Sequence, residues 1–227
     1  MIDRLVPAGV ATAEAFTDPP GLEPMPAELS LIAKAVDKRR REFTTARHCA
    51  RQAMAQLGIE PAPILRGERG APVWPAGVVG SLTHCDGYRG AVVAYGLGVR
   101  SLGIDAEPHA PLPDGVLDHT SIAAERAVLA TRAPGLHWDR LLFCAKEATY
   151  KAWFPLTNRW LGFEDAHITF TRTDAAGPAA ADAGATGEFV SRILIDPKTD
   201  DGGEPLLELR GRWLIDGGLI MTSITVA

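Results

Sequence analysis

Apolar residues recur at helical spacing through the first quarter of the chain. Residues 27–57 follow this pattern, and in the second half one face carries Phe43, Ala46, Ala50, Met54 and Leu57. The spacing weakens near residues 36–38, which predicts a break or bend, and Gly58 supplies a C-terminal stop. We therefore expect a helix in two pieces, with irregular, proline-rich chain before it and a loop after it.

Short apolar runs bounded by turn residues follow, and they predict β-strands. The first group of expected strands covers residues 79–84, 91–95 and 101–105. Helical spacing returns over residues 121–131 and 138–154, where Leu142, Ala145, Thr149 and Trp153 predict a buried stripe. A second group of strands is expected at residues 166–171, 188–195, 206–213 and 219–226. Residues 174–187 are rich in Ala and Gly and predict a loop or hairpin tip without regular structure.

The order of these elements is helix then strands, followed by helices then strands. This order predicts an α+β protein of two α/β lobes of similar size, residues 1–105 and 106–227. The letters carry no internal repeat that would demonstrate a duplication.

Composition narrows the functional class. The chain has 227 residues, of which 46% are hydrophobic and 22% charged, so it can bury a core. A net charge of -5 argues against a general nucleic-acid or membrane-surface binder. The three cysteines have no C-x-x-C spacing, no apolar run is long enough to span a membrane, and Met1-Ile2-Asp3-Arg4 does not begin a signal peptide. We expect a soluble cytoplasmic protein with no membrane and no nucleic-acid partner.

Two acids close the strand expected at residues 101–105. Asp105 and Glu107 are two residues apart, so their side chains project to the same side. Converging carboxylates repel each other, and a hard divalent cation such as Mg²⁺ relieves that repulsion. A solvated turn before Pro108 would place the same residues there, and the pair alone does not decide between the two.

The helix expected at residues 138–154 carries further charges. Glu147 and Lys151 are four residues apart and share one side, and Lys146 is adjacent to Glu147. An exposed ion pair is one interpretation. Apolar bulk at Phe143, Tyr150 and Phe154 favours the other, in which these charges face a protein wall at a metal–polyphosphate site.

Basic residues and hydroxyls supply candidate anion contacts. Arg39 and Arg47 flank the apolar stripe of the first helix, where a cation is costly unless it meets an anion. The strand expected at residues 79–84 presents Ser81 and Thr83 on one face and ends in His84. Solvated arginines and a packing histidine are the alternative for this group.

In order, these pieces resemble the 4'-phosphopantetheinyl transferase superfamily, in its two-lobed siderophore-synthase and actinobacterial type. The resemblance rests on Gly67-x-x-Gly-x-Pro-x-Trp-Pro leading to Ser81-Leu-Thr-His84, on Leu102-Gly-Ile-Asp105-x-Glu107, and on Phe143-Cys-x-Lys146-Glu147-Ala-x-Tyr-Lys151. The basic helix from Arg39 and the Trp160-Leu-Gly-Phe163 segment continue it. It implies two similar α/β lobes in a pseudo-twofold arrangement, with the active site at their interface.

The resemblance also implies roles for the charged residues. Asp105, Glu107 and Glu147 would hold Mg²⁺ or Mn²⁺, and Lys146 and Lys151 would lie against the pyrophosphate of coenzyme A. The catalytic set would be Glu147, Lys151 and Asp105. The remaining cofactor-binding positions would contact the nucleotide and its 3'-phosphate: Arg39, Arg47, Arg66, Ser81, Thr83 and His84.

The implied reaction transfers 4'-phosphopantetheine from coenzyme A to a serine of apo acyl carrier or peptidyl carrier proteins and releases 3',5'-ADP. The carriers would serve fatty-acid, polyketide or siderophore synthesis, and the enzyme would act as a monomer. A metal-dependent phosphohydrolase of coenzyme A or a nucleotide is the alternative reaction. A non-catalytic coenzyme A-binding module and a nucleic-acid binder based on residues 38–41 are the further alternatives.

Overall fold

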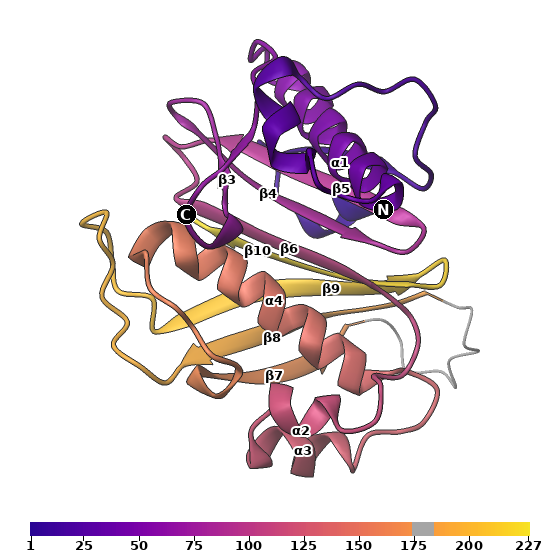
Figure 1. Cartoon of the computed structure of the whole chain (residues 1–227). Helices are drawn as coiled ribbons and strands as arrows, with labels where there is room; N and C mark the ends of the chain where they lie inside the picture. Colours follow the sequence, from indigo (N-terminus) through magenta and orange to yellow (C-terminus); the bar gives the residue numbers. More distant parts are fainter. Residues whose placement is uncertain (174–183) are drawn as a thin grey trace.

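A computed structural model describes residues 1–173 and 184–227 (Figure 1). It confirms the mixed α+β class: antiparallel sheets of three and five strands are each packed against one long helix, and a third sheet has two short strands. No helix within these described ranges is long and apolar enough to cross a membrane. The two larger sheets differ in size, and one long helix packs on each.

The first unit packs helix α1 on a small sheet. Helix α1 (Asp37–Gln56) follows the short 3₁₀ helix η2 (Pro26–Ile32), which confirms the predicted break. The sheet has the strand order β1 (Ala11–Ala15), β5 (Tyr88–Tyr95), β4 (Val78–Cys85). Cys49, Ala50, Ala53 and Met54 of α1 are fully buried against it, because small residues at helical spacing let the helix approach the sheet.

The second unit packs helix α4 (Trp138–Thr157) across a five-stranded sheet. Its strand order is β6 (Ser101–Pro108), β10 (Leu219–Val226), β9 (Glu208–Asp216), β8 (Ala185–Ile193), β7 (Ala166–Arg172). The stripe predicted on α4 is buried, and its Trp153 shares a core with Trp213 of the sheet. The predicted boundary at residue 105 falls inside β6.

Short elements complete the fold. They are η1 (Ile2–Leu5), β2 (Leu65–Arg66), η3 (Glu68–Gly70), β3 (Pro72–Val73), α2 (Val116–Thr120), α3 (Ala123–Leu129) and η4 (Phe163–Asp165). The loop predicted over residues 174–187 lies outside the described residues up to 183. Beyond that it is wrong, since residues 185–187 belong to β8 and pair with residues 213–215 of β9.

Each unit contains a buried glutamate at the start of a short helix. Glu28 in η2 accepts a hydrogen bond from Met25 N, and Glu125 in α3 accepts one from Ile122 N, both at 2.9 Å. Each carboxylate also accepts an N–H from a nearby extended segment and pairs with a cation of the long helix. The two units therefore share a local device that ties helix to sheet.

The two sheets meet where β4 lies beside β6 (Figure 1). Ile104 N donates to Ser81 Oγ and Ala106 N donates to Thr83 Oγ1, each at 3.1 Å. From one bond to the next both residue numbers rise by two, so β4 and β6 run in the same direction along this seam. Side-chain hydroxyls accept the N–H groups here, whereas backbone carbonyls would accept them in a continuous sheet. The seam fixes how the first unit sits on the second.

Helix α4 approaches β6 closely at Gly103. A Cβ atom added there would lie 2.0 Å from Ala148 O and 2.7 Å from Ala152 N, closer than any real contact. Ser101 Oγ donates to Ala152 O at 2.8 Å beside it. Glycine at position 103 therefore sets the distance between the helix and the strand.

We expect Gly103→Ala to lower the free energy of unfolding by about 2–3 kcal/mol, because helix and strand must separate to admit the methyl group. Chemical denaturation measures the change. Gly98→Ala is the matched control, since nothing lies within 4 Å of its added Cβ atom. Equal stability of the two variants would contradict the close approach.

Candidate active site

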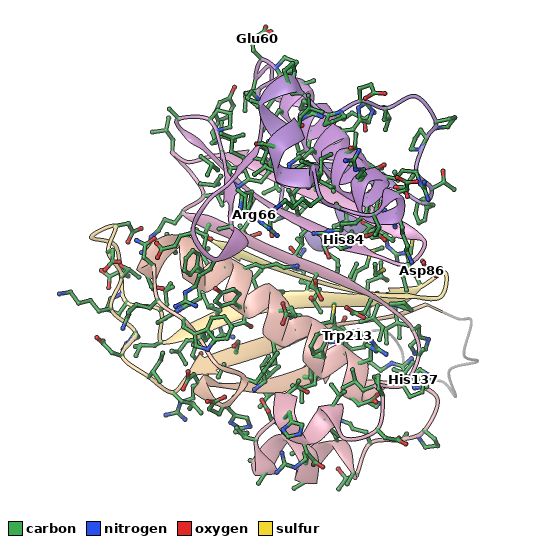
Figure 2. All side chains as sticks on the ribbon, viewed as in Figure 1. Glu60, Arg66, His84, Asp86, His137 and Trp213 are labelled. Carbon is green, nitrogen blue, oxygen red and sulfur yellow. The ribbon has the colours of Figure 1, made fainter. Side chains whose placement is uncertain are left out.

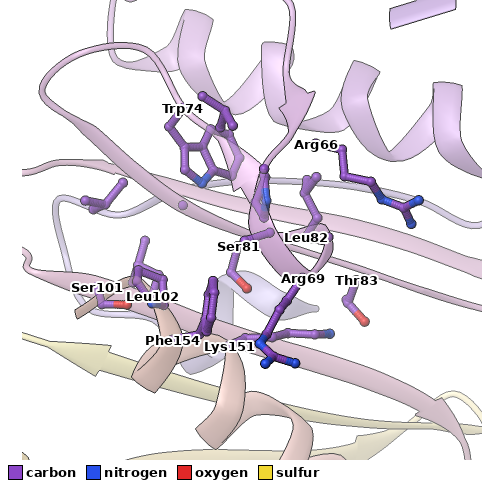
Figure 3. A pocket seen from close by; sticks show the side chains of 18 of the residues that line it. Arg66, Arg69, Trp74, Ser81, Leu82, Thr83, Ser101, Leu102, Lys151 and Phe154 are labelled. Carbon is purple, nitrogen blue, oxygen red and sulfur yellow. The ribbon is translucent and has the colours of Figure 1, made fainter. Parts of the chain in front are cut away.

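A groove of about 660 Å³ lies between the two units. Figure 3 shows Lys151 and Phe154 of α4 on one side of it and Arg66 and Trp74 of the first unit on the other. Residues of α1, of the loop after β2, of β4, of β6 and of α4 line it together. Segments far apart in the sequence therefore form one cavity, which is large enough for a nucleotide-sized ligand.

Asp105 and Lys151 form the central ion pair of the groove. Asp105 Oδ1 accepts hydrogen bonds from Lys151 Nζ at 2.7 Å and from Thr83 Oγ1 at 3.0 Å. Lys151 Nζ also donates to Ile104 O at 3.0 Å. Burial lowers the pKa of Lys151, but the Asp105 carboxylate outweighs burial and holds that pKa above its ordinary value. A fixed cation thus faces the groove next to the seam.

The three predicted acids influence one another. Burial, followed by the charge of Asp105, raises the pKa of both Glu107 and Glu147. Asp105 Oδ2 is buried and has no hydrogen-bond partner among the described residues. Such an oxygen fits a ligand that the side chains present do not supply.

The three acids do not form a complete set of metal ligands. Within the described parts of the chain, no three His, Cys, Asp or Glu side chains are gathered closely enough to hold a metal ion. The Glu107 carboxylate instead pairs with Arg140 at 2.9 Å. Sequence reasoning missed Arg140, because it lies 33 positions from Glu107 and on another turn of α4 from Glu147.

Lys146 lies away from the groove, contrary to its predicted place against a pyrophosphate. Its ammonium pairs with Glu125 at 2.9 Å and donates to Phe163 O and Ala166 O, and its side chain is 2% exposed. Burial lowers the pKa of Lys146 although Glu125 opposes that shift. Adjacent residues on a helix point about 100° apart, so Glu147 and Lys146 reach different environments.

Arg39 and His84 meet at the other side of the groove. Arg39 Nη1 is hydrogen-bonded to His84 Nε2, and His84 Nδ1 lies 3.8 Å from a carboxylate oxygen of Glu42. Burial and the Arg39 cation lower the pKa of His84. Both residues line the cavity, and Figure 2 places His84 and Arg66 where the two units meet.

Arg47 is the most buried cation of the groove wall. Its Nε donates to Ile64 O at 2.8 Å, and its guanidinium lies 3.3 Å from the centre of the Phe43 ring. Burial lowers the pKa of Arg47 to about 10. The group remains charged at neutral pH, and a bound anion would replace part of the hydration that it has lost.

The remaining predicted contacts, Arg66, Ser81 and Thr83, all line the groove, although the two hydroxyls are already engaged in the seam. The sequence analysis missed Arg69 and Trp74, which also line it. Both residues lie within the Gly67-x-x-Gly-x-Pro-x-Trp motif, which was the sequence signal that could have identified them. Gly80 explains the place of Trp74, since a Cβ atom there would lie 2.6 Å from the indole.

Comparison with known proteins gives consistent matches over both units. Residues 27–94 match the 4'-phosphopantetheinyl transferase N-terminal domain family, and residues 101–194 match the 4'-phosphopantetheinyl transferase superfamily. The chain is 60% identical to the 4'-phosphopantetheinyl transferases PptT of Mycobacterium tuberculosis and Npt of Nocardia iowensis, covering all of this chain and 98% and 100% of those proteins. It is 49% identical to Svp of Streptomyces mobaraensis, covering all of this chain and 89% of that protein.

We expect acid to destabilise the protein partly through His84. The pKa of His84 is lower in the folded protein than in the unfolded chain. As the pH falls through the ordinary histidine range, the unfolded chain therefore binds a proton at this position and the folded chain does not, which favours unfolding. Between about pH 7.5 and pH 5.5, spanning the ordinary pKa of histidine, His84→Gln should therefore lose less unfolding free energy than the parent protein does.

Denaturant titrations at the two pH values measure this difference. His119→Gln removes an exposed imidazole and serves as the control. An unchanged pH dependence in His84→Gln would show that His84 does not resist protonation in the folded state.

Proposed function

The chain belongs to the 4'-phosphopantetheinyl transferase superfamily and is an enzyme of that type, and on this premise we propose that its groove transfers 4'-phosphopantetheine from coenzyme A to a serine of acyl carrier and peptidyl carrier proteins. The observation that carries the proposal is the shared groove. It presents the Asp105–Lys151 pair beside Glu147 and also a second group of cations around Arg47. Phosphoryl transfer requires both positioning and charge neutralisation along a polyphosphate.

The basic side of the groove suits the nucleotide. Arg39, Arg47 and His84 would bind the 3'-phosphate of the adenosine, and Arg66 would add a phosphate contact. Arginine donors match phosphate oxygens in pairs, which gives orientation as well as charge. The hydroxyl-bearing strand β4, with Ser81 and Thr83, would form the wall against which the nucleotide lies.

The acidic side of the groove fits a divalent cation. Asp105 and Glu147 line the groove, whereas Glu107 does not, and the buried Asp105 Oδ2 has no hydrogen-bond partner among the described residues. Burial and the charge of Asp105 raise the pKa of both Glu107 and Glu147. These three carboxylates would hold Mg²⁺ or Mn²⁺, with Glu107 exchanging its Arg140 partner for the ion. When bound, the ion would neutralise charge on the pyrophosphate and on the departing nucleotide.

The reaction then forms one bond and breaks one. The carrier serine oxygen attacks the phosphorus that bears pantetheine, and the bond from that phosphorus to the 3',5'-ADP oxygen breaks with its electron pair. Lys151 stabilises the charge that develops along the pyrophosphate. Glu147, which lines the groove with Lys151, accepts the serine proton. Lys146 is not part of this proposal, because it pairs with Glu125.

On the same premise we propose a pseudo-twofold relation between the unit of α1 with its three-stranded sheet and the unit of α4 with its five-stranded sheet, which includes all of β6, with the active site between them. Each unit has a long helix on an antiparallel sheet and a buried glutamate that pairs with that helix. We also infer that the enzyme works as a cytoplasmic monomer on carriers of fatty-acid, polyketide or siderophore synthesis.

Intact-mass measurement of an apo carrier protein tests the function. After incubation with the enzyme, coenzyme A and Mg²⁺, the carrier should gain one phosphopantetheine group, and a carrier with Ser→Ala at the acceptor position should gain none. Chelation of the divalent ion should abolish the gain. Release of 3',5'-ADP at the same rate with and without the carrier would instead identify a coenzyme A hydrolase.

Glu147→Gln separates proton transfer from binding. We expect kcat to fall by about 10²–10⁴-fold, the range typical of a lost general base, while the Kd for coenzyme A stays within about threefold. Single-turnover kinetics and calorimetry measure the two quantities. A proportionate loss of both would assign Glu147 to binding alone.

A further inference from the structure

Glu28 is a fully buried carboxylate outside the groove, in the short helix η2. Oε2 accepts the Met25 N–H at 2.9 Å, and Oε1 accepts the Ile64 N–H at 2.8 Å. Oε1 also receives a hydrogen bond from Arg51 Nη1 at 2.9 Å and lies 3.9 Å from Arg47 Nε. One carboxylate therefore joins η2, helix α1 and the segment before β2.

Ile64 is held from both sides of its peptide backbone. Glu28 accepts its N–H, and Arg47 Nε donates to its carbonyl oxygen at 2.8 Å. The chain continues from Ile64 through Leu65 to Arg66, which lines the groove. The positions of Arg47 and Arg66 therefore both depend on the same short piece of backbone.

Glu28 also balances charge. Arg47 is almost buried, and the cations of Arg39, Arg51 and Arg66 all act on it unfavourably, whereas Glu28 acts favourably. A buried guanidinium without a counter-charge is costly and would turn toward solvent. Glu28 Oε1 lies 3.9 Å from Arg47 Nε, which donates to Ile64 O, and Arg47 lines the cavity.

We propose that Glu28 is a positioning residue for the 3'-phosphate of coenzyme A, acting through Arg47 and the Ile64–Arg66 backbone. The proposal rests on the function proposed above, in which Arg47 and Arg66 contact phosphate. Glu28 itself does not line the groove. Its removal should therefore weaken recognition of the 3'-phosphate and leave the pantetheine and pyrophosphate contacts unaffected.

Calorimetric binding of coenzyme A and of 3'-dephospho-coenzyme A tests this role in the whole chain. Glu28→Gln should raise the Kd for coenzyme A by about tenfold or more, the effect of losing one well-formed charged contact, and change the Kd for 3'-dephospho-coenzyme A by less than about threefold. A general structural effect would instead raise both Kd values equally.

Glu125→Gln is the matched control. Glu125 is also a buried glutamate at the start of a short helix, and it accepts Ile168 N at 2.7 Å and pairs with Lys146, which does not line the groove. It should lose a comparable amount of thermal stability and keep the parental ratio of the two Kd values. A collapse of that ratio in Glu125→Gln as well would overturn the assignment.

Glu28→Asp covers the case in which Glu28→Gln does not fold. This substitution keeps the charge but places the carboxylate one methylene farther from Arg47. The ratio of the Kd for 3'-dephospho-coenzyme A to the Kd for coenzyme A should therefore still fall toward one. A folded Glu28→Asp protein with the parental ratio would overturn the proposal. The mass test of the carrier is independent of this role. If the carrier gains no mass while the protein still distinguishes coenzyme A from 3'-dephospho-coenzyme A, the transferase function is refuted and the role of Glu28 is not.

Discussion

Two hydroxyl groups join the two sheets of this protein, and the groove depends on that junction. Ser81 and Thr83 accept the free N–H groups of β6, so β4 and β6 lie side by side without a backbone ladder. Thr83 also donates a hydrogen bond to Asp105, and Asp105 accepts another from Lys151 of α4. The contact that unites the two units is therefore the one that holds the central ion pair, and a shift of the seam would move both.

Burial, as well as residue type, determines how the charged side chains of the groove are stabilised. On the acidic side, burial and the charge of Asp105 raise the pKa of Glu107 and Glu147, and Asp105 Oδ2 is buried with no hydrogen-bond partner among the described residues. On the basic side, Arg47 is nearly buried and depends on Glu28 and on the Phe43 ring.

Buried glutamates give each unit its internal support. Glu28 and Glu125 each cap a short helix, accept an N–H from a neighbouring extended segment and neutralise a cation of the long helix. The two devices differ in the cations beside them. Glu28 pairs with Arg51 at 2.9 Å and lies 3.9 Å from Arg47, which lines the groove, whereas Lys146, beside Glu125, donates to the Phe163 and Ala166 carbonyls away from the groove.

The sequence by itself determined the class of fold, most of the elements and the family, because helical and strand periodicity and short motifs are local properties. It located α1 after a break, the buried stripe of α4 and the strand that carries Asp105. Only the tertiary structure decided that Lys146 is buried against Glu125, that Arg140 pairs with Glu107, and that Glu28 lies 3.9 Å from Arg47. These pairs join residues 19 to 33 positions apart, and spacing along one element cannot show which charge from another element will meet it. The packing of helix on sheet, set by close contacts such as that at Gly103, makes that choice.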